Sequence, residues 1–279
     1  MKAAAFDYEC PSRVDEAVRL LAEAPGAKLL AGGQTLGPML NLRLARPDLL
    51  IDITRIPELV RVEETNDAVT FGACVSHAAI EDGLAPDPAG GLMRDVAAGI
   101  AYRAVRTRGT IGGSLAHCDP SADWLSCLLA LDATLSLSGA AGARTIGLSD
   151  FARGAMMSDL APDEIIDGIT VARVSGAAEC GYAKICRKTG EFADAIGVAV
   201  HDPERGVSRF VVGATQGAPI VLTAEDLGFP ADRPLPAVAD GAVDGIGEAI
   251  AAREPSMDDY DTRIHAVALA RAIKEACRA

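Results

Sequence analysis

The chain has 279 residues, of which 49% are hydrophobic, so it is long enough to bury the cores of two compact domains. Only 4% of the residues are aromatic and the formal net charge is −13, which excludes nucleic acid as a partner because bases need stacking surfaces and phosphates need cations. The first residues lack a sustained apolar core, and no run approaches the roughly 18 apolar residues of a membrane helix, which predicts a cytoplasmic protein with neither signal peptide nor membrane span.

The N-terminal half is predicted to alternate helices with short strands. Pro25-Gly26 ends the first helix, and Arg46-Pro47 ends the second, because proline cannot continue a helix. In chain order we predict a helix that Ser12 caps, a strand at 28–31, a turn at 32–35, a helix from Leu36, a buried strand at 49–53, a hairpin at 59–63 and 68–74, and a helix that Ser76 caps.

The character of the sequence changes near residues 173 to 180, a stretch of small residues without periodicity that marks a domain boundary. Before it, residues 133 to 138 alternate as a half-exposed strand. After it, YAKICR, ADAIGVAV and VSRFVVGAT predict three strands in an antiparallel meander, because a turn signal joins the last two. The remaining predicted elements are a short helix that Thr223 and Asp226 open, and helices at 238–252 and 260–277.

Two glycine segments each lead into a predicted helix. The first is Gly32-Gly33-Gln34-Thr35, and the second lies within RAVRTRGTIGGSLAHCDPSADWLSCLLAL, residues 103–131. Glycine permits positive φ and close approach of a ligand, and successive backbone N–H groups beside a helix N-terminus bind anions. We therefore predict that both segments bind phosphate and that Gly109, Gly112 and Gly113 take positive φ.

The second segment has further features that suit an anion. Thr110 and Ser114 add hydroxyl donors, and Asp119 is predicted to cap a helix whose first residue is Pro120. Walker A and GxGxxG signatures are excluded, since no Gly-Lys pair occurs and GGQTLG spaces its glycines differently. From the residues alone, an ordinary glycine turn followed by an ordinary helix cap stays open as the alternative.

The sequence shows no signature of a metal site or of a catalytic side chain. Its seven cysteines are scattered and include no CxxC pair, which favours reduced thiols over disulfides or an iron–sulfur cluster. The four histidines are not clustered, and His117 has neither a nucleophile nor an orienting carboxylate at a known spacing. We therefore predict no metal and no catalytic residue on this chain.

Taken together, AGGQTLGPMLNLRLARPDLLIDI and VRTRGTIGGSLAHCDPSADW resemble the paired FAD-binding signature of the flavoprotein (medium) subunits of the xanthine oxidase and aerobic carbon monoxide dehydrogenase family of molybdenum hydroxylases. The resemblance continues to the closing YDTRIHAVALARAIKEA. It implies an α+β fold with a two-subdomain, vanillyl-alcohol-oxidase-like FAD-binding domain at 1–173, divided into about 1–55 and 56–173. A C-terminal flavoprotein domain at 178–279 would hold a three-stranded antiparallel sheet and helices.

The resemblance also assigns cofactor contacts to individual residues. Asp123 matches an acidic residue that contacts the adenosine part of FAD, and Lys184 matches a lysine that lies against the flavin from the opposite side. From the residues alone, Asp123 is interpreted as a solvated acid in the first turn of a helix and Lys184 as an exposed strand lysine.

Further contacts follow from the same resemblance. Ile165 or Ile166 matches an aliphatic flavin contact, and Ile100 and Ala101 match the segment that enters the flavin pocket, although the residues alone indicate core positions for all four. The backbone of the glycine segments would hold the phosphates of FAD, at Ala31, Gly32, Gly33, Gln34, Thr35 and Leu36 and at Thr110, Ile111, Gly112, Gly113 and Ser114.

The function that the resemblance implies is electron transfer within a larger complex. An iron–sulfur small subunit and a molybdenum-cofactor large subunit, assembled with this chain as a dimer of heterotrimers, would carry the [2Fe-2S] clusters and the molybdenum cofactor. FAD on this chain would pass electrons to NAD, oxygen or another acceptor. Two alternatives stay open at this point, a stand-alone FAD-dependent oxidase and an assembly subunit without cofactor.

Overall fold

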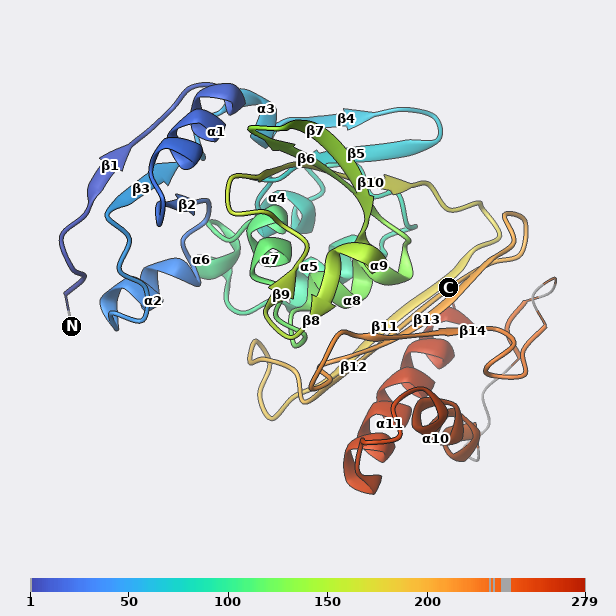
Figure 1. Ribbon diagram of the computed structural model, residues 1–279. Helices are drawn as coiled ribbons and strands as arrows, with labels where there is room; N and C mark the ends of the chain where they lie inside the picture. The colour runs from blue at the N-terminus through green and yellow to red at the C-terminus, as the bar shows by residue number, and fades with distance from the viewer. Residues whose placement is uncertain (1, 231, 233, 237–241, 279) are drawn as a thin grey trace.

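The structure is a computed structural model that describes residues 2–230, 232, 234–236 and 242–278. The described strands form a three-stranded, a five-stranded and a four-stranded sheet, with a small two-stranded hairpin besides. The sheets follow one another along the chain, and central helices lie between the N-terminal unit, in blue, and the C-terminal sheet, in yellow to orange (Figure 1). Within the described residues, no helix has both the length and the apolar character needed to cross a bilayer.

The N-terminal unit is a parallel sheet of order β1-β3-β2 that packs against helix α1. Its helix begins one residue later than predicted, because Arg13 and not Ser12 occupies the N-cap position. The backbone N–H of Ser12 instead donates to Glu16 Oε2 at 3.2 Å. The elements are β1 (Asp7–Glu9), α1 (Val14–Glu23), β2 (Lys28–Leu30), α2 (Leu36–Asn41) and β3 (Leu49–Asp52), so the second helix ends earlier than predicted.

The central unit is an antiparallel sheet of order β4-β5-β10-β6-β7, in which β10 returns from far along the chain to the middle. Its apolar face packs on helices through the fully buried Phe71, Trp124 and Phe151. The predicted cap at Ser76 is confirmed, since its side chain accepts a hydrogen bond from the N–H of Ala79 at 3.2 Å. The elements are α3 (Pro57–Val60), β4 (Val62–Glu64), β5 (Ala68–Gly72), α4 (His77–Glu81), α5 (Leu92–Gly99), α6 (Arg103–Arg106), α7 (Ile111–His117), α8 (Asp123–Ala130), β6 (Thr134–Gly139), β7 (Gly142–Gly147), α9 (Leu148–Phe151), β8 (Ala152–Gly154), β9 (Met157–Ser158) and β10 (Ile165–Ala172).

The C-terminal unit is a four-stranded antiparallel sheet, not the three-stranded sheet that the sequence predicts. The additional strand, Ile220–Thr223, pairs with β13 along the sheet edge. The capping signature is satisfied without a helix, because Asp226 Oδ2 accepts hydrogen bonds from the backbone and hydroxyl of Thr223 at 2.8 and 2.9 Å and closes a turn. The strands are β11 (Glu179–Ile185), β12 (Ala195–Asp202), β13 (Val207–Gly213) and β14 (Ile220–Thr223).

Helices cover both faces of this C-terminal sheet. Helix α8 of the central unit packs on β12 and β13, while α11 packs on β11 and β12 with α10 beside it. The helices are α10 (Ala242–Arg253) and α11 (Asp259–Ala276), and the start of the helix predicted at 238–252 lies outside the described residues.

Glycines bring α11 unusually close to the sheet. A Cβ at Gly181 of β11 would lie 2.0 Å from the carbonyl oxygen of Ala272, and a Cβ at Gly197 of β12 would lie 2.5 Å from the carbonyl of Ala268. Helix and strands therefore meet backbone to backbone, which larger residues at these positions would prevent.

Candidate functional site

The second glycine segment is itself the start of a helix. Thr110 is the N-cap of α7, and its Oγ1 accepts a hydrogen bond from the N–H of Gly113 at 3.2 Å. The prediction of positive φ at Gly109, Gly112 and Gly113 is wrong, since none of the three is among the residues with positive φ. At two of these positions a side chain would clash with a neighbour. A Cβ at Gly109 would lie 2.7 Å from His77 Nε2, and a Cβ at Gly112 would lie 2.4 Å from the Cβ of Ala73.

The first glycine segment lies directly against the second. A Cβ at Gly32 would lie 2.0 Å from the carbonyl oxygen of Arg108, and a Cβ at Gly113 would lie 3.6 Å from the Cβ of Ala31. Gly33 does take positive φ, at 70°, which turns the chain between β2 and α2. The structure therefore brings together the two segments that the sequence predicted as phosphate sites, although about 75 residues separate them along the chain.

The first segment has the donors that an anion needs. Within the part of the chain that the structure describes, the backbone N–H groups of Gly33, Gln34 and Thr35 donate no hydrogen bond. The side chains of Gln34 and Thr35 are exposed, as is Gly113 at the start of α7. Successive unpaired N–H groups around a residue of positive φ form an anion-binding concavity, so the pyrophosphate of a dinucleotide fits the residues present here.

Asp119 caps a turn and not the helix. Its Oδ1 accepts a hydrogen bond from the N–H of Ser121 at 2.9 Å, and Ala122 occupies the N-cap position of α8. The predicted helix start at Pro120 is therefore wrong, because the side chain of Asp119 closes its own local turn first. As a result, Asp123 becomes the first residue of α8 and is buried.

Asp123 forms a buried ion pair with Lys184. Lys184 Nζ lies 2.8 Å from Asp123 Oδ1, and the two side chains are only 9% and 10% exposed. The interpretations from the residues alone, a solvated acid and an exposed lysine, are therefore both wrong. Because Asp123 begins α8 and Lys184 lies on β11, the pair joins the central and C-terminal units.

Tyr182 is a third member of this cluster that the sequence did not indicate. Its hydroxyl donates a hydrogen bond to Asp123 Oδ1. Burial and, to a smaller extent, the nearby Asp123 carboxylate raise the pKa of Tyr182 far above its usual range, so the phenol stays protonated. The signal available in the sequence was the spacing, since Tyr182 and Lys184 are two apart on one strand and share a face.

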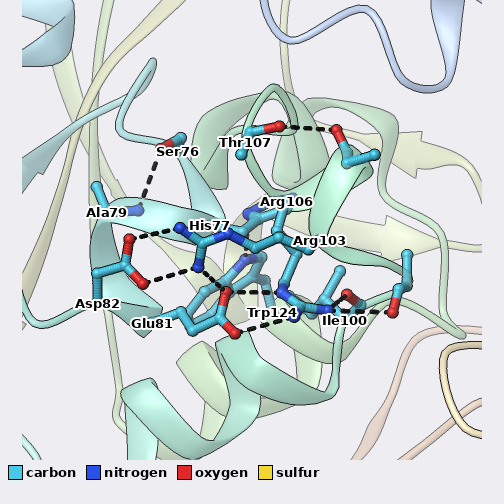
Figure 2. Close-up of polar contacts among 12 residues, drawn as sticks. Ser76, His77, Ala79, Glu81, Asp82, Ile100, Arg103, Arg106, Thr107 and Trp124 are labelled. Atoms are coloured by element: carbon cyan, nitrogen blue, oxygen red, sulfur yellow. Dashed lines mark hydrogen bonds and ion pairs between the residues drawn. The ribbon is translucent and has the colours of Figure 1, made fainter.

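The segment at Ile100 and Ala101 connects α5 to α6 and has an unusual backbone. Ala101 takes a φ of 42°, in the left-handed region that non-glycine residues seldom adopt. Arg106 donates hydrogen bonds to the carbonyl oxygens of Ile100 and Ala101, and Lys184 donates one to Gly99 (Figure 2 shows Arg106 and Ile100). Arg106 and its partner Glu81 are residues that the sequence did not indicate.

Ile165 and Ile166 begin β10 and are 1% and 4% exposed. Ile165 packs in the N-terminal core with Ile51, whereas Ile166 packs in the central core. Both therefore have the core role that the residues alone indicate, and their contact with flavin stays a prediction.

His77 lies beneath the second glycine segment and is paired with the protein's single tryptophan. Trp124 Nε1 donates a hydrogen bond to His77 Nδ1 at 2.9 Å (Figure 2). Burial and the positive charge of Arg106 lower the pKa of His77 to about 4. The imidazole is therefore neutral in the folded protein. The backbone N–H of His77 donates a hydrogen bond to the carbonyl oxygen of Gly109 at 2.9 Å, which joins the start of α4 to the second glycine segment.

We expect the folded protein to lose stability as the pH falls from about 6.5 towards 4. In this range the unfolded imidazole of His77 takes up a proton and the folded one does not, so the unfolded state is favoured by roughly 2 to 3 kcal/mol at pH 4.5. Urea unfolding followed by Trp124 fluorescence at pH 7 and pH 4.5 measures this change. In His77→Gln, which cannot take up the proton, the loss should be smaller by that amount, and equal losses in both proteins would contradict the prediction.

Comparisons with known proteins agree with this geometry. A family model described as the FAD binding domain in molybdopterin dehydrogenase matches residues 4–173. The nicotine 6-hydroxylase medium subunit of Paenarthrobacter nicotinovorans is 38% identical over 223 residues, covering 78% of this chain and 77% of that protein. The carbon monoxide dehydrogenase medium chain of Hydrogenophaga pseudoflava is 39% identical over 227 residues, covering 79% of this chain and 77% of that protein.

The similarity to these proteins extends to the three-dimensional structure. A solved structure of carbon monoxide dehydrogenase from Hydrogenophaga pseudoflava superposes with a TM-score of 0.86 at 34% identity, covering 99% of this chain and 98% of that chain. This protein therefore belongs to the family of FAD-binding medium subunits of molybdopterin-dependent hydroxylases such as carbon monoxide dehydrogenase, and it is a flavoprotein subunit of an oxidoreductase.

Proposed function

We propose that this chain carries the FAD through which electrons leave a multi-subunit molybdenum hydroxylase. Bound FAD would supply the redox chemistry, accepting electrons from the iron–sulfur clusters of a partner subunit and passing them to NAD, oxygen or another acceptor. The observation that carries the proposal is the contact between two glycine segments, one of which has three consecutive backbone N–H groups that donate no hydrogen bond within the described part of the chain. Such an arrangement suits the two phosphates of one dinucleotide.

The chain's own residues would bind and orient the cofactor in three places. Residues 31–36 and 110–114 would hold the pyrophosphate through backbone N–H groups and hydroxyls, and Asp123 would accept hydrogen bonds from the adenosine ribose. Lys184, with Ile100 and Ala101, would bound the flavin ring, and Ile165 or Ile166 would add an aliphatic contact. Asp123 and Lys184 form an ion pair with each other at 2.8 Å between the central and C-terminal units, and the cofactor contacts proposed for them follow from the family resemblance.

The domain division that we propose follows the sheets. An FAD-binding domain at 1–173 would consist of subdomains at about 1–55 and 56–173, and the C-terminal domain would span 178–279. In support, β1 to β3 lie within residues 7–52, β4 to β10 within 62–172, and β11 to β14 within 179–223.

The partners that we propose are an iron–sulfur small subunit and a large subunit with the molybdenum cofactor, in a dimer of heterotrimers. The relatives named above are medium subunits or chains, a designation that implies a smaller and a larger companion. Within the described residues, no group of three or more histidine, cysteine, aspartate or glutamate side chains is arranged to hold a metal ion. In this proposal, substrate oxidation takes place on the partners.

The isolated chain tests the proposal. After reconstitution with FAD, we expect flavin absorbance in the protein fraction and reduction of an artificial dye by NADH, without hydroxylation of aldehydes, purines or carbon monoxide. Hydroxylation of any of these substrates by the isolated chain would show a stand-alone enzyme. Failure to bind any flavin would instead indicate an assembly subunit, and purification of the native complex identifies the accompanying chains.

A further inference from the structure

The carbonyl oxygens of residues 99 to 101, just before α6, each accept a hydrogen bond from a side chain outside that segment. Lys184 Nζ donates to the oxygen of Gly99 at 3.2 Å, and Arg106 Nη1 donates to the oxygens of Ile100 and Ala101 at 2.9 and 3.2 Å. Gly190, in the loop after β11, packs so closely on Ala101 that an added Cβ would lie 2.7 Å from the Ala101 oxygen. The backbone of residues 99–101 is therefore restrained by the central and the C-terminal unit together.

Arg106 is itself held in place by Glu81. Its Nε and Nη2 donate to the two carboxylate oxygens of Glu81 at 2.7 and 2.9 Å, a bidentate pair that leaves Nη1 for the carbonyls (Figure 2). The side chains of Arg106 and Glu81 are only 12% and 19% exposed, and hydrogen bonds from Arg106 hold the pKa of Glu81 below its usual range. Glu81 is thus ionised at neutral pH, and the guanidinium has one orientation.

These contacts hold residues 99 to 101 in a backbone conformation that is otherwise unfavourable. Ala101 takes its left-handed conformation immediately before α6, and such a conformation persists only when surrounding contacts determine it. With the carbonyls engaged, the N–H groups of Ala101 and Tyr102 donate no hydrogen bond within the residues that the structure describes. The segment therefore faces its surroundings with two unpaired donors.

We propose that Arg106, oriented by Glu81, is a positioning residue that fixes residues 100–102 for contact with the flavin ring. This inference rests on the proposed function, because it takes Ile100 and Ala101 as flavin contacts. Arg106 acts through the backbone that it holds and does not itself contact the cofactor. Lysine cannot replace it, since an ammonium group lacks the planar array of donors that reaches a carboxylate and two carbonyls at once.

A neighbouring arginine provides the matched control. Arg103 lies on the same helix α6 and donates to the same Glu81 at 2.7 Å, and it also pairs with Asp82. Its side chain is 49% exposed, and its described hydrogen bonds do not reach the carbonyls of residues 99–101. Arg103→Lys therefore perturbs the same ion-pair cluster without releasing the segment.

The experiment compares wild type, Arg106→Lys and Arg103→Lys after reconstitution with FAD. We expect Arg106→Lys to raise the Kd for FAD about tenfold, or about 1.4 kcal/mol, and to shift the visible absorption bands of the flavin that remains bound. Arg103→Lys should match wild type in both. A role in folding alone would lower the amount of folded protein but leave the spectrum of bound flavin unchanged, so the spectral shift separates positioning from stability.

Two further variants keep the inference testable if Arg106→Lys does not fold. Glu81→Gln leaves the guanidinium present but without its charged partner, and Gly190→Ala presses on the carbonyl of Ala101 from the other side. Both should shift the flavin bands in the same sense as Arg106→Lys. If wild type binds FAD and the folded variants match it in Kd and spectrum, the positioning role is overturned and the proposed function stands. If wild type binds no FAD, both are overturned.

Discussion

With Gly113→Val, the purified protein is expected to lose most of its bound FAD while it keeps its fold. A Cβ at this position lies 2.8 Å from Thr110 Oγ1, the acceptor of the N-cap hydrogen bond, and 3.6 Å from the Cβ of Ala31 in the first glycine segment. Valine therefore fills the space between the two segments and disturbs the cap of α7. Overpacking costs about 1–3 kcal/mol, so the Kd for FAD should rise by about tenfold to a hundredfold.

Gly176→Val is the matched control for this substitution. Gly176 is exposed, has no positive φ, and would place a Cβ with no atom within 4 Å. Titration of the FAD-free proteins, followed by quenching of flavin fluorescence, gives the two Kd values, and circular dichroism reports the fold. Equal affinity for FAD in the two variants would show that the second glycine segment is not part of the phosphate site.

Lys184→Met is expected to lower the free energy of unfolding by about 3–5 kcal/mol, because it leaves the Asp123 carboxylate buried without its cation. The pair is nine-tenths buried, so solvent screens it little. The same change should lower the reduction potential of bound FAD, since a nearby positive charge stabilises the additional negative charge of the reduced cofactor. Urea denaturation and a spectroscopic redox titration measure the two effects.

The double variant Asp123→Leu with Lys184→Met separates the cost of an unpaired charge from the value of the pair. Replacement of both partners by apolar side chains should recover part of the lost stability, because the charge is removed but the Tyr182 hydroxyl loses its acceptor, whereas the potential should stay low. Lys188→Met, at an exposed position in the following loop, is the charge-matched control and should alter neither quantity. A Lys184→Met protein as stable as wild type, with an unchanged potential, would show that the pair has no such role.

Local signals made much of the fold predictable. The cap at Ser76 and the strand, turn and helix around Gly32-Gly33 depend on residues within one or two turns of each other, and the structure has them where the sequence predicts them. The resemblance of the two glycine motifs added the family, because both motifs together are far more specific than either turn.

Interactions between distant residues account for what the sequence did not predict. The shared face of Tyr182 and Lys184 follows from their spacing, but their contacts with Asp123 span 59 and 61 residues and the contact of Arg106 with Glu81 spans 25, so no local pattern indicates these partners. The strand at Ile220–Thr223 was missed because its edge pairing overrode a local capping signature. At Gly112 the requirement is space beside Ala73, which a reading of glycine as a turn former does not anticipate.

The close seating of α11 on Gly181 and Gly197 has a mechanical consequence. Ala268 and Ala272 are one helical turn apart, and they lie against Gly197 and Gly181 of two neighbouring strands. Movement of α11 along the sheet would therefore bring backbone atoms into steric clash. The C-terminal sheet and its helix therefore behave as one rigid body, whose other face packs on α8 of the central unit. Because β12 and β13 also pack on α8, Asp123 and Lys184 can separate only if the whole sheet moves together with α11.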